Sequence, residues 1–166
     1  MHVQLKLTLE CSPEVAVDAL ANPQVMVAVT RPLLVYRSEE PEGFPRRWDT
    51  TPREVSARIL GLFSLGRTHV HLRFYEVAAA RIQEDTGEGI DGAFAKMTIR
   101  HRMAISVAPT APGALGEESL LRDRIEFHAG ALTPLLWPGL WLVWQWRGRR
   151  MRQLAPSWQR DSARAR

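Results

Sequence analysis

The stretch that decides the fold reads "AFAKMTIRHRMAISV" over residues 93–107 and "ESLLRDRIEFH" over residues 118–128. In both segments hydrophobic and polar side chains alternate, which is the period of a β-strand with one buried face. The loop between them, residues 109–116, contains two prolines and two glycines and predicts a hairpin. We therefore expect two long antiparallel strands that lie side by side in one sheet.

The period changes after Gly130, where "TPLLWPGLWLVWQWRGRRMRQL" covers residues 133–154. One stripe recurs at helical spacing, and Trp137 and Trp141 widen it. Because a proline inside a helix removes a hydrogen bond and kinks it, the sequence predicts that the main helix begins near Pro138 and ends before Pro156. The residues of the stripe are Leu136, Leu140, Val143, Trp144, Arg147, Met151 and Leu154.

The first part of the chain predicts one more strand, two short helices and then mainly strands. Residues 2–9 alternate strictly, and Ser12 and Pro13 form a typical helix start. A second short helix is expected near residues 25–29, and residues 41–47 read as a polar turn. Further strands are expected over residues 33–38, 54–61, 67–77 and 81–85. The order predicts an α+β fold, in which an antiparallel sheet of about six or seven strands is covered by the long C-terminal helix.

Length and composition favour one soluble domain. The 166 residues match one ordinary domain, which we expect over 1–156, followed by a basic tail without fixed structure over 157–166. The single cysteine, Cys11, excludes an internal disulfide and is expected to be a small packed side chain. No signal-peptide pattern opens the sequence, and the apolar stretch 135–146 is too short to span a bilayer. We therefore expect a cytoplasmic protein.

The charge is positive, with a formal net charge of +4, and arginine supplies nearly all of the 22 basic residues. Seven of the arginines lie within residues 147–166. They fit either a solvated, arginine-rich helix end or a surface for an anionic membrane or for RNA. DNA is not expected as a partner, and no interleaving of aromatic and basic residues on a strand supports RNA binding.

Two polar residues occupy apolar faces of the strands that decide the fold. His101 shares its face with Ile99 and Met103, and Asp123 is the one charge on the inner face of the last strand. If the hairpin turn is centred near Pro112, Asp123 lies opposite His101, and a slip of two residues leaves the pair diagonal. A buried carboxylate is costly unless it is paired, so we expect these two residues to interact, with Arg147 as a further candidate partner. The pair can be a structural ion pair, an anchor for a ligand, or an acid–base pair.

The segments "IRHRMAISV", "LLRDRIEFHAGAL" and "WLVWQWRGRRMRQL" resemble the START-like, or SRPBCC, helix-grip superfamily of polyketide cyclases, lipid-transfer domains and pollen-allergen proteins. They are similar to a bacterial branch with a His on the second-last strand, an Asp on the last strand and an Arg in the final helix. His101, Asp123 and Arg147 stand at those places, whereas Ile99 departs from the aromatic residue that often precedes the His. The resemblance implies a helix-grip fold with a ligand cavity between sheet and helix.

Three functions are therefore expected, in this order. The first is binding of a small hydrophobic or amphipathic ligand, without cofactor or metal. The second is a cyclase or dehydratase with His101 as base and Asp123 as its orienting acid. The third is a peripheral membrane or RNA contact through the C-terminal arginines. The residues expected to bind the ligand are Met97, Ile99, His101, Met103, Leu121, Asp123, Ile125, Phe127, Leu140, Trp144 and Arg147.

A metal site is not expected, although His69 and His71 have a spacing that metals use. Val70 and Leu72 take the apolar face of that predicted strand. The two histidines are therefore expected on the solvent side, together with Arg73.

Overall fold

The computed structural model describes residues 1–109 and 118–164. The predicted hairpin loop therefore lies, from residue 110 to residue 116, outside the described residues. The elements follow one another along the chain as β1 (His2–Leu9), α1 (Pro13–Leu20), α2 (Pro23–Thr30), β2 (Leu34–Ser38), β3 (Arg53–Ile59), β4 (Phe63–Val70), β5 (Leu72–Val77), β6 (Ala80–Asp85), β7 (Glu88–Gly89), the 3-10 turn η1 (Phe94–Lys96), β8 (Thr98–Val107), β9 (Ser119–His128) and α3 (Thr133–Arg164).

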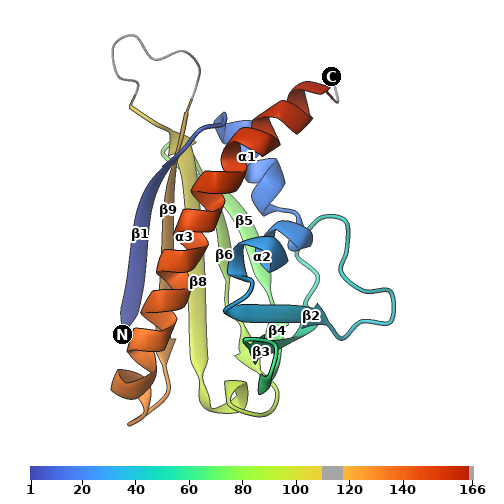
Figure 1. The fold of residues 1–166 in the computed structure, drawn as a ribbon, viewed down its shortest axis with the longest axis vertical. Helices are drawn as coiled ribbons and strands as arrows, with labels where there is room; N and C mark the ends of the chain where they lie inside the picture. Colours follow the sequence, from blue (N-terminus) through green and yellow to red (C-terminus); the bar gives the residue numbers. More distant parts are fainter. Residues whose placement is uncertain (110–117, 165–166) are drawn as a thin grey trace.

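All strands belong to one antiparallel sheet that curls around α3 (Figure 1). Its main order is β1-β9-β8-β7-β4-β3-β2, while β6 pairs with β8 and β5 pairs with β6. Consecutive pieces β4 and β5, and likewise β6 and β7, act as one bent strand each, so the sheet is seven strands wide. The predicted α+β helix-grip architecture, with its two short helices after the first strand, is confirmed.

Two predicted strands differ from those in the structure. The strand expected over residues 67–77 is broken at His71, whose backbone N–H donates to the side chain of Asp85 (2.9 Å) instead of to a neighbouring strand. The strand expected from residue 93 begins only at Thr98, because Phe94 lies in η1 and packs into a small core cluster with Leu34 and Ala57. Local alternation does not reveal either break, since both depend on contacts distant in sequence.

Helix α3 is longer at both ends than the sequence predicted. It begins at Thr133, whose hydroxyl accepts from the N–H of Ala129 (2.8 Å) and donates to the carbonyl of Gly130 (2.7 Å). Pro138 and Pro156 lie inside the helix and do not end it.

The tail that we expected to lack fixed structure is helical over residues 157–164, which corrects the prediction. Trp158 packs against the main core, and the side chain of Gln159 accepts from the N–H of Ser12 (3.0 Å). These tertiary contacts offset the hydrogen bond that Pro156 removes.

The main core lies between β1, β8, β9 and α3. Val3, Leu5, Leu7 and Leu9 are buried on the inner face of β1, as the alternation predicted, and Cys11 is buried beside them. Gly148 lets α3 approach this strand closely, because a Cβ atom there would lie 3.0 Å from a methyl group of Leu5. Within the described residues, no helix is both long and apolar enough to cross a membrane.

Candidate functional site

A cavity of about 430 Å³ opens between the concave face of the sheet, α2 and the first half of α3. Its walls are mainly apolar side chains, with a few polar groups among them. This size and composition are typical of sites for small molecules, which are usually apolar clefts of roughly 300–1,000 Å³ with a few polar groups.

Asp123 is the centre of a buried polar cluster beside this cavity. One carboxylate oxygen lies 2.6 Å from Nε2 of His101 and accepts from the indole N–H of Trp144 (3.3 Å). The other accepts from Nε of Arg147 (2.9 Å). Asp123 is fully buried, and Arg147 is nearly so. The expected meeting of His101, Asp123 and Arg147 is therefore confirmed.

The strand register brings His101 and Asp123 together diagonally. His101 pairs with Ile125, and Asp123 pairs with Met103, which is a slip of two residues from direct opposition. Diagonal neighbours on one face of a sheet remain within reach of long side chains. The two groups therefore lie on the same inner face because side chains alternate along each strand, and a slip of two residues does not change that face.

The cluster fixes the charge of Asp123 and the orientation of the imidazole. Burial by itself raises the pKa of Asp123, but the charges of His101 and Arg147 and their hydrogen bonds outweigh it and hold that pKa well below its ordinary range. The ionised carboxylate can only accept, so Nε2 of His101 carries the proton of this hydrogen bond. The other ring nitrogen, Nδ1, takes no part in the cluster. The edge of the imidazole packs against Trp144, with ring centres 5.3 Å apart.

Asp85, which is not among the predicted site residues, is a second acid at this site. It ends β6, pairs directly with His101 across β6 and β8, and lines the cavity. Burial raises the pKa of Asp85 to about 6, although the N–H of His71 and the charges of His101 and His71 act in the opposite direction. A carboxyl group with this pKa changes its charge close to neutral pH.

Tyr36, in β2, is a further polar group on the cavity wall. Burial raises the pKa of Tyr36 to about 12, which the nearby charge of Arg147 opposes and that of Asp85 supports. Its hydroxyl is therefore neutral and able to donate a hydrogen bond. Gln83, which pairs with Met103 across β6 and β8, also lines the cavity.

Nine of the eleven residues that we expected to bind a ligand line the cavity. Leu121 and Asp123 do not, because Leu121 is fully buried in the main core and Asp123 lies behind the side chains that it binds. The nine are Met97, Ile99, His101, Met103, Ile125, Phe127, Leu140, Trp144 and Arg147.

The wall opposite β8 and β9 contains none of the predicted site residues. It comes from α2, β2 and the β3–β4 hairpin, whose alternation is short and irregular. The sequence did contain one indication of Asp85. In "ARIQED" it lies two residues after Gln83, so both side chains point to the same face of the strand. Recognising it required the pairing of β6 with β8, which the sequence does not contain.

The remaining candidates from the sequence stay outside the site. His69 is exposed on β4, while His71 sits in the break between β4 and β5, so the two do not continue along one strand. Among the described residues, no group of three or more His, Cys, Asp or Glu side chains is placed to hold a metal ion. Cys11 is packed in the core, as expected, with its sulfur 3.9 Å from the hydroxyl of Ser119.

Comparison with known proteins supports the fold. A hypothetical protein from Helicobacter pylori matches with a TM-score of 0.64 and 9% identity, over 93% of this chain and 88% of the other. The chain has a helix-grip architecture. A protein from Chromobacterium violaceum has a TM-score of 0.58 and 16% identity over 93% and 96% of the two chains. A conserved protein from Geobacillus kaustophilus has a TM-score of 0.53 and 9% identity over 95% and 96%.

No protein-family model matches the chain, and no curated protein matches it. At identities this low, the likeness to these solved structures concerns the fold alone.

Proposed function

We propose that this chain is a START-like protein that binds a small hydrophobic or amphipathic molecule in its cavity. The observation that carries the proposal is a polar group of side chains, Tyr36, Asp85, His101 and Arg147, on the wall of an otherwise apolar cavity. Apolar walls supply affinity, and a few polar groups fix the orientation of a ligand.

Several polar atoms of these side chains have no hydrogen-bond partner within residues 1–109 and 118–164. They are the hydroxyl of Tyr36, the second carboxylate oxygen of Asp85, Nδ1 of His101 and one terminal nitrogen of Arg147. A ligand hydroxyl or carbonyl group can satisfy them, since they include both donors and acceptors. We infer that the ligand carries at least one such group and places its apolar part toward α2 and the β3–β4 hairpin.

A purely structural ion pair accounts for only part of this arrangement. Asp123, His101 and Arg147 satisfy one another, as an ion pair that closes the core would. Asp85 and Tyr36 take no part in that pair, yet both are half-buried on the cavity wall. Their unpaired oxygens are open to the cavity, so a bound ligand that excludes water there would have to supply the partner that water gives.

The test is binding of a neutral apolar dye, N-phenyl-1-naphthylamine, followed by its fluorescence. Leu140 lines the cavity, so Leu140→Trp should fill it and weaken dye binding by about tenfold or more, the effect expected from steric loss of a well-packed apolar contact. Leu135→Trp is the matched control, because Leu135 is exposed on the same helix and does not line the cavity.

Unchanged dye affinity in Leu140→Trp, with the fold intact by circular dichroism, would argue against the cavity as the binding site. Native mass spectrometry of the purified chain then tests for a small molecule that copurifies with the wild type and is absent from Leu140→Trp.

An enzyme of the cyclase or dehydratase type is the second candidate, and Asp85 is the observation that favours it. His101 lies between an acid that remains ionised, Asp123, and one whose pKa is raised to about 6. Such a pair of groups can accept and return a proton at a carbon next to a carbonyl group. His101→Ala separates the candidates, because a binding protein keeps most of its dye affinity whereas an enzyme loses turnover of a carbonyl substrate.

A further inference from the structure

Exposed hydrophobic side chains concentrate at the mouth of the cavity. Eight of the thirteen large hydrophobic residues that are exposed in the described chain belong to two short segments. One is the β3–β4 hairpin, and the other is the start of α3 with the residue before it. Besides Trp141, they are the seven residues that we call the apolar rim: Ile59, Leu60, Leu62, Phe63, Leu132, Leu135 and Leu142.

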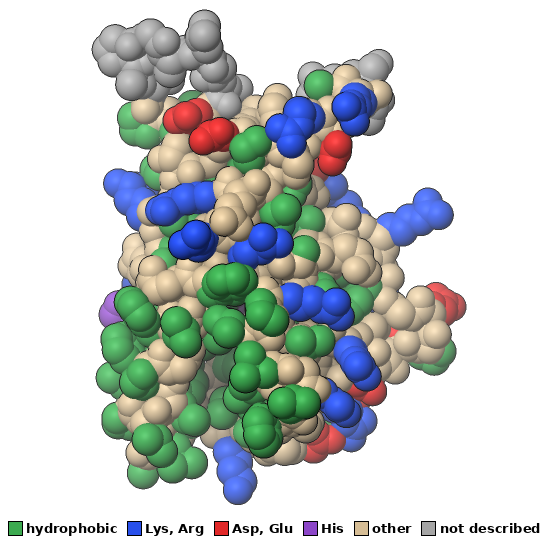
Figure 2. Space-filling model, in the orientation of Figure 1, with side chains coloured by type: hydrophobic (Ala, Val, Ile, Leu, Met, Phe, Trp, Pro, Cys, Tyr) green, Lys and Arg blue, Asp and Glu red, His purple; other side chains and the backbone are tan. Residues whose placement is uncertain are grey.

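The two halves of the apolar rim face the same opening. Ile59 and Leu60 line the cavity from the hairpin, and Leu142 lines it from α3, although about eighty residues separate them in sequence. The most exposed members are Leu135 at 75%, Leu62 at 73% and Phe63 at 67%. Figure 2 shows the hydrophobic side chains gathered on the lower part of the face that carries α3. An apolar patch this concentrated is typical of an interaction surface.

Charge is distributed unevenly around this opening. Four of the segments that contribute to it, residues 31–38, 55–65, 92–107 and 129–153, contain no Asp or Glu. They do contain the exposed basic side chains of Arg31, Arg37, Arg58 and Lys96. None of these four forms an ion pair with a residue that the structure describes. Within these four segments every formal charge is therefore positive, and the acid on the cavity wall, Asp85, comes from β6.

We propose that the apolar rim docks on the surface of an anionic lipid bilayer, so that the cavity opens directly toward the membrane. Apolar side chains that enter the boundary between headgroups and acyl chains, bordered by Lys and Arg, are the combination that holds peripheral proteins on such surfaces. Trp141, exposed next to Leu142, is of the residue type enriched at that boundary. An amphipathic ligand would then pass between bilayer and cavity without crossing water.

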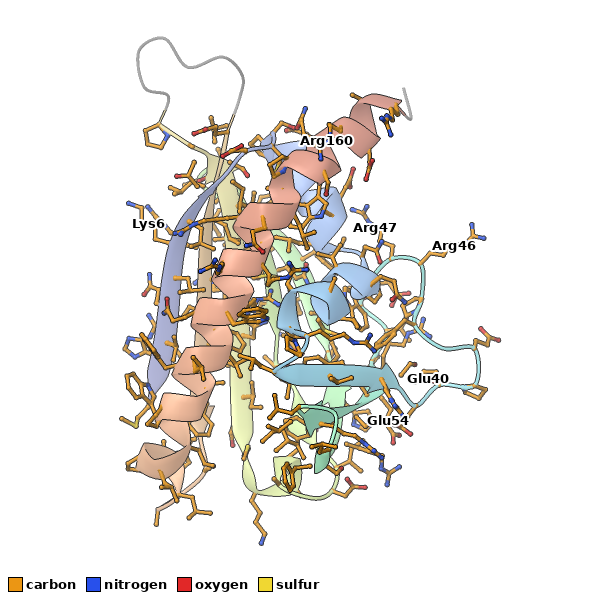
Figure 3. The ribbon with its side chains drawn as sticks, in the orientation of Figure 1. Lys6, Glu40, Arg46, Arg47, Glu54 and Arg160 are labelled. Atoms are coloured by element: carbon orange, nitrogen blue, oxygen red, sulfur yellow. The ribbon has the colours of Figure 1, made fainter. Side chains whose placement is uncertain are left out.

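This surface is distinct from the last arginines of the chain, Arg160 and Arg164. Arg160, labelled in Figure 3, lies toward the far end of α3 from the segment that carries Leu132 and Leu135. The docking inference also stands independently of the proposed function, because it concerns the outside of the cavity mouth. Vesicle binding can therefore succeed or fail separately from dye binding.

The test is flotation of the full chain with vesicles of phosphatidylcholine alone or mixed with phosphatidylglycerol. The chain should float with the mixed vesicles and bind them less well at near-molar salt. The double variant Leu62→Ser, Phe63→Ser should weaken binding by about tenfold or more, because it removes two apolar side chains from the contact. The matched control is Phe74→Ser, Val77→Ser, since these two residues are also exposed but lie outside the apolar rim.

A second pair of variants locates the basic contribution. Arg58→Gln, Lys96→Gln should weaken binding to mixed vesicles by about fivefold for each charge removed, whereas Arg160→Gln, Arg164→Gln should leave it unchanged. Absence of flotation, or a loss caused by the Arg160 and Arg164 variant instead, overturns the proposal. So does sedimentation that reveals a dimer broken by the Leu62 and Phe63 variant, because a second copy of the chain would then cover the apolar rim.

Discussion

At the scale of single residues, the site depends on two acids with opposite electrostatic situations. Asp123 receives hydrogen bonds from His101, Trp144 and Arg147, and it remains ionised although it is fully buried. Asp85 receives only the N–H of His71, and burial raises its pKa. Asp123 therefore keeps its negative charge, whereas the charge of Asp85 changes close to neutral pH.

Replacing Asp123 should be strongly destabilising. Asp123→Asn removes the negative charge and leaves His101 and Arg147 buried without compensation, so we expect a loss of about 3–5 kcal/mol in the free energy of unfolding. Urea denaturation measures this loss. Glu126→Gln, on the exposed side of the same strand, is the control and should change stability little. A loss below about 1 kcal/mol for Asp123→Asn would contradict the buried charge network.

Asp85 should make stability depend on pH in the opposite direction from Asp123. Because its pKa is raised on folding, the folded chain holds a proton that the unfolded chain releases, so this residue lowers stability as the pH rises from about 4 to 6. The contribution is up to about 3 kcal/mol for a shift of roughly two pH units.

Asp85→Asn keeps an oxygen that accepts from His71, and it should remove this decline. Urea denaturation across this pH range compares the variant with the wild type. The pKa of Asp123 is lowered, so its own contribution is lost only as the pH falls below its ordinary range near 4. Parallel profiles for wild type and Asp85→Asn would show that Asp85 is not the group that titrates.

At the scale of elements, local sequence patterns predicted which face of a strand or helix is buried, but not at which residue the strand or helix ends. The alternation of β1 matches the observed buried face, and so does the stripe of α3, except that Trp141, which was expected to widen it, is exposed. The break at His71 depends on the side chain of Asp85, and the extension of α3 beyond Pro156 depends on Trp158 and Gln159. Because these partners lie far away in sequence, no local pattern contains them.

The end of α3 offers a direct test of that contact. Trp158→Ala should remove about 1–2 kcal/mol of packing for a half-buried side chain and allow residues 157–164 to fray. Hydrogen exchange should then become faster in those residues and remain slow in residues 141–151. Arg152→Ala, exposed on the same helix, serves as the control. Rapid exchange of residues 157–164 in the wild type would contradict a packed helix end.

At the scale of the whole molecule, strand alternation predicted one side of the site, and the other side was not predicted. Two strands with clean alternation were enough to place His101 and Asp123 on the inner face, and the helical stripe brought Arg147 to them. Asp85 and Tyr36 complete the polar wall from β6 and β2, which the alternation alone did not place around the cavity. The sequence therefore predicted one side of the cavity, while the other side follows from how the sheet curls around α3 (Figure 1).

The central claim is that the space between sheet and helix holds a small ligand, and methyl NMR spectra during titration with N-phenyl-1-naphthylamine test it most directly. We expect shifts at the methyl groups of Met97, Ile99, Met103 and Ile125, which line the cavity from β8, β9 and the residue before β8. The methyl groups of Leu7 and Val55 should remain in place. Shifts confined to the exposed Leu62 and Leu135, or no shifts at all, would contradict an internal binding site.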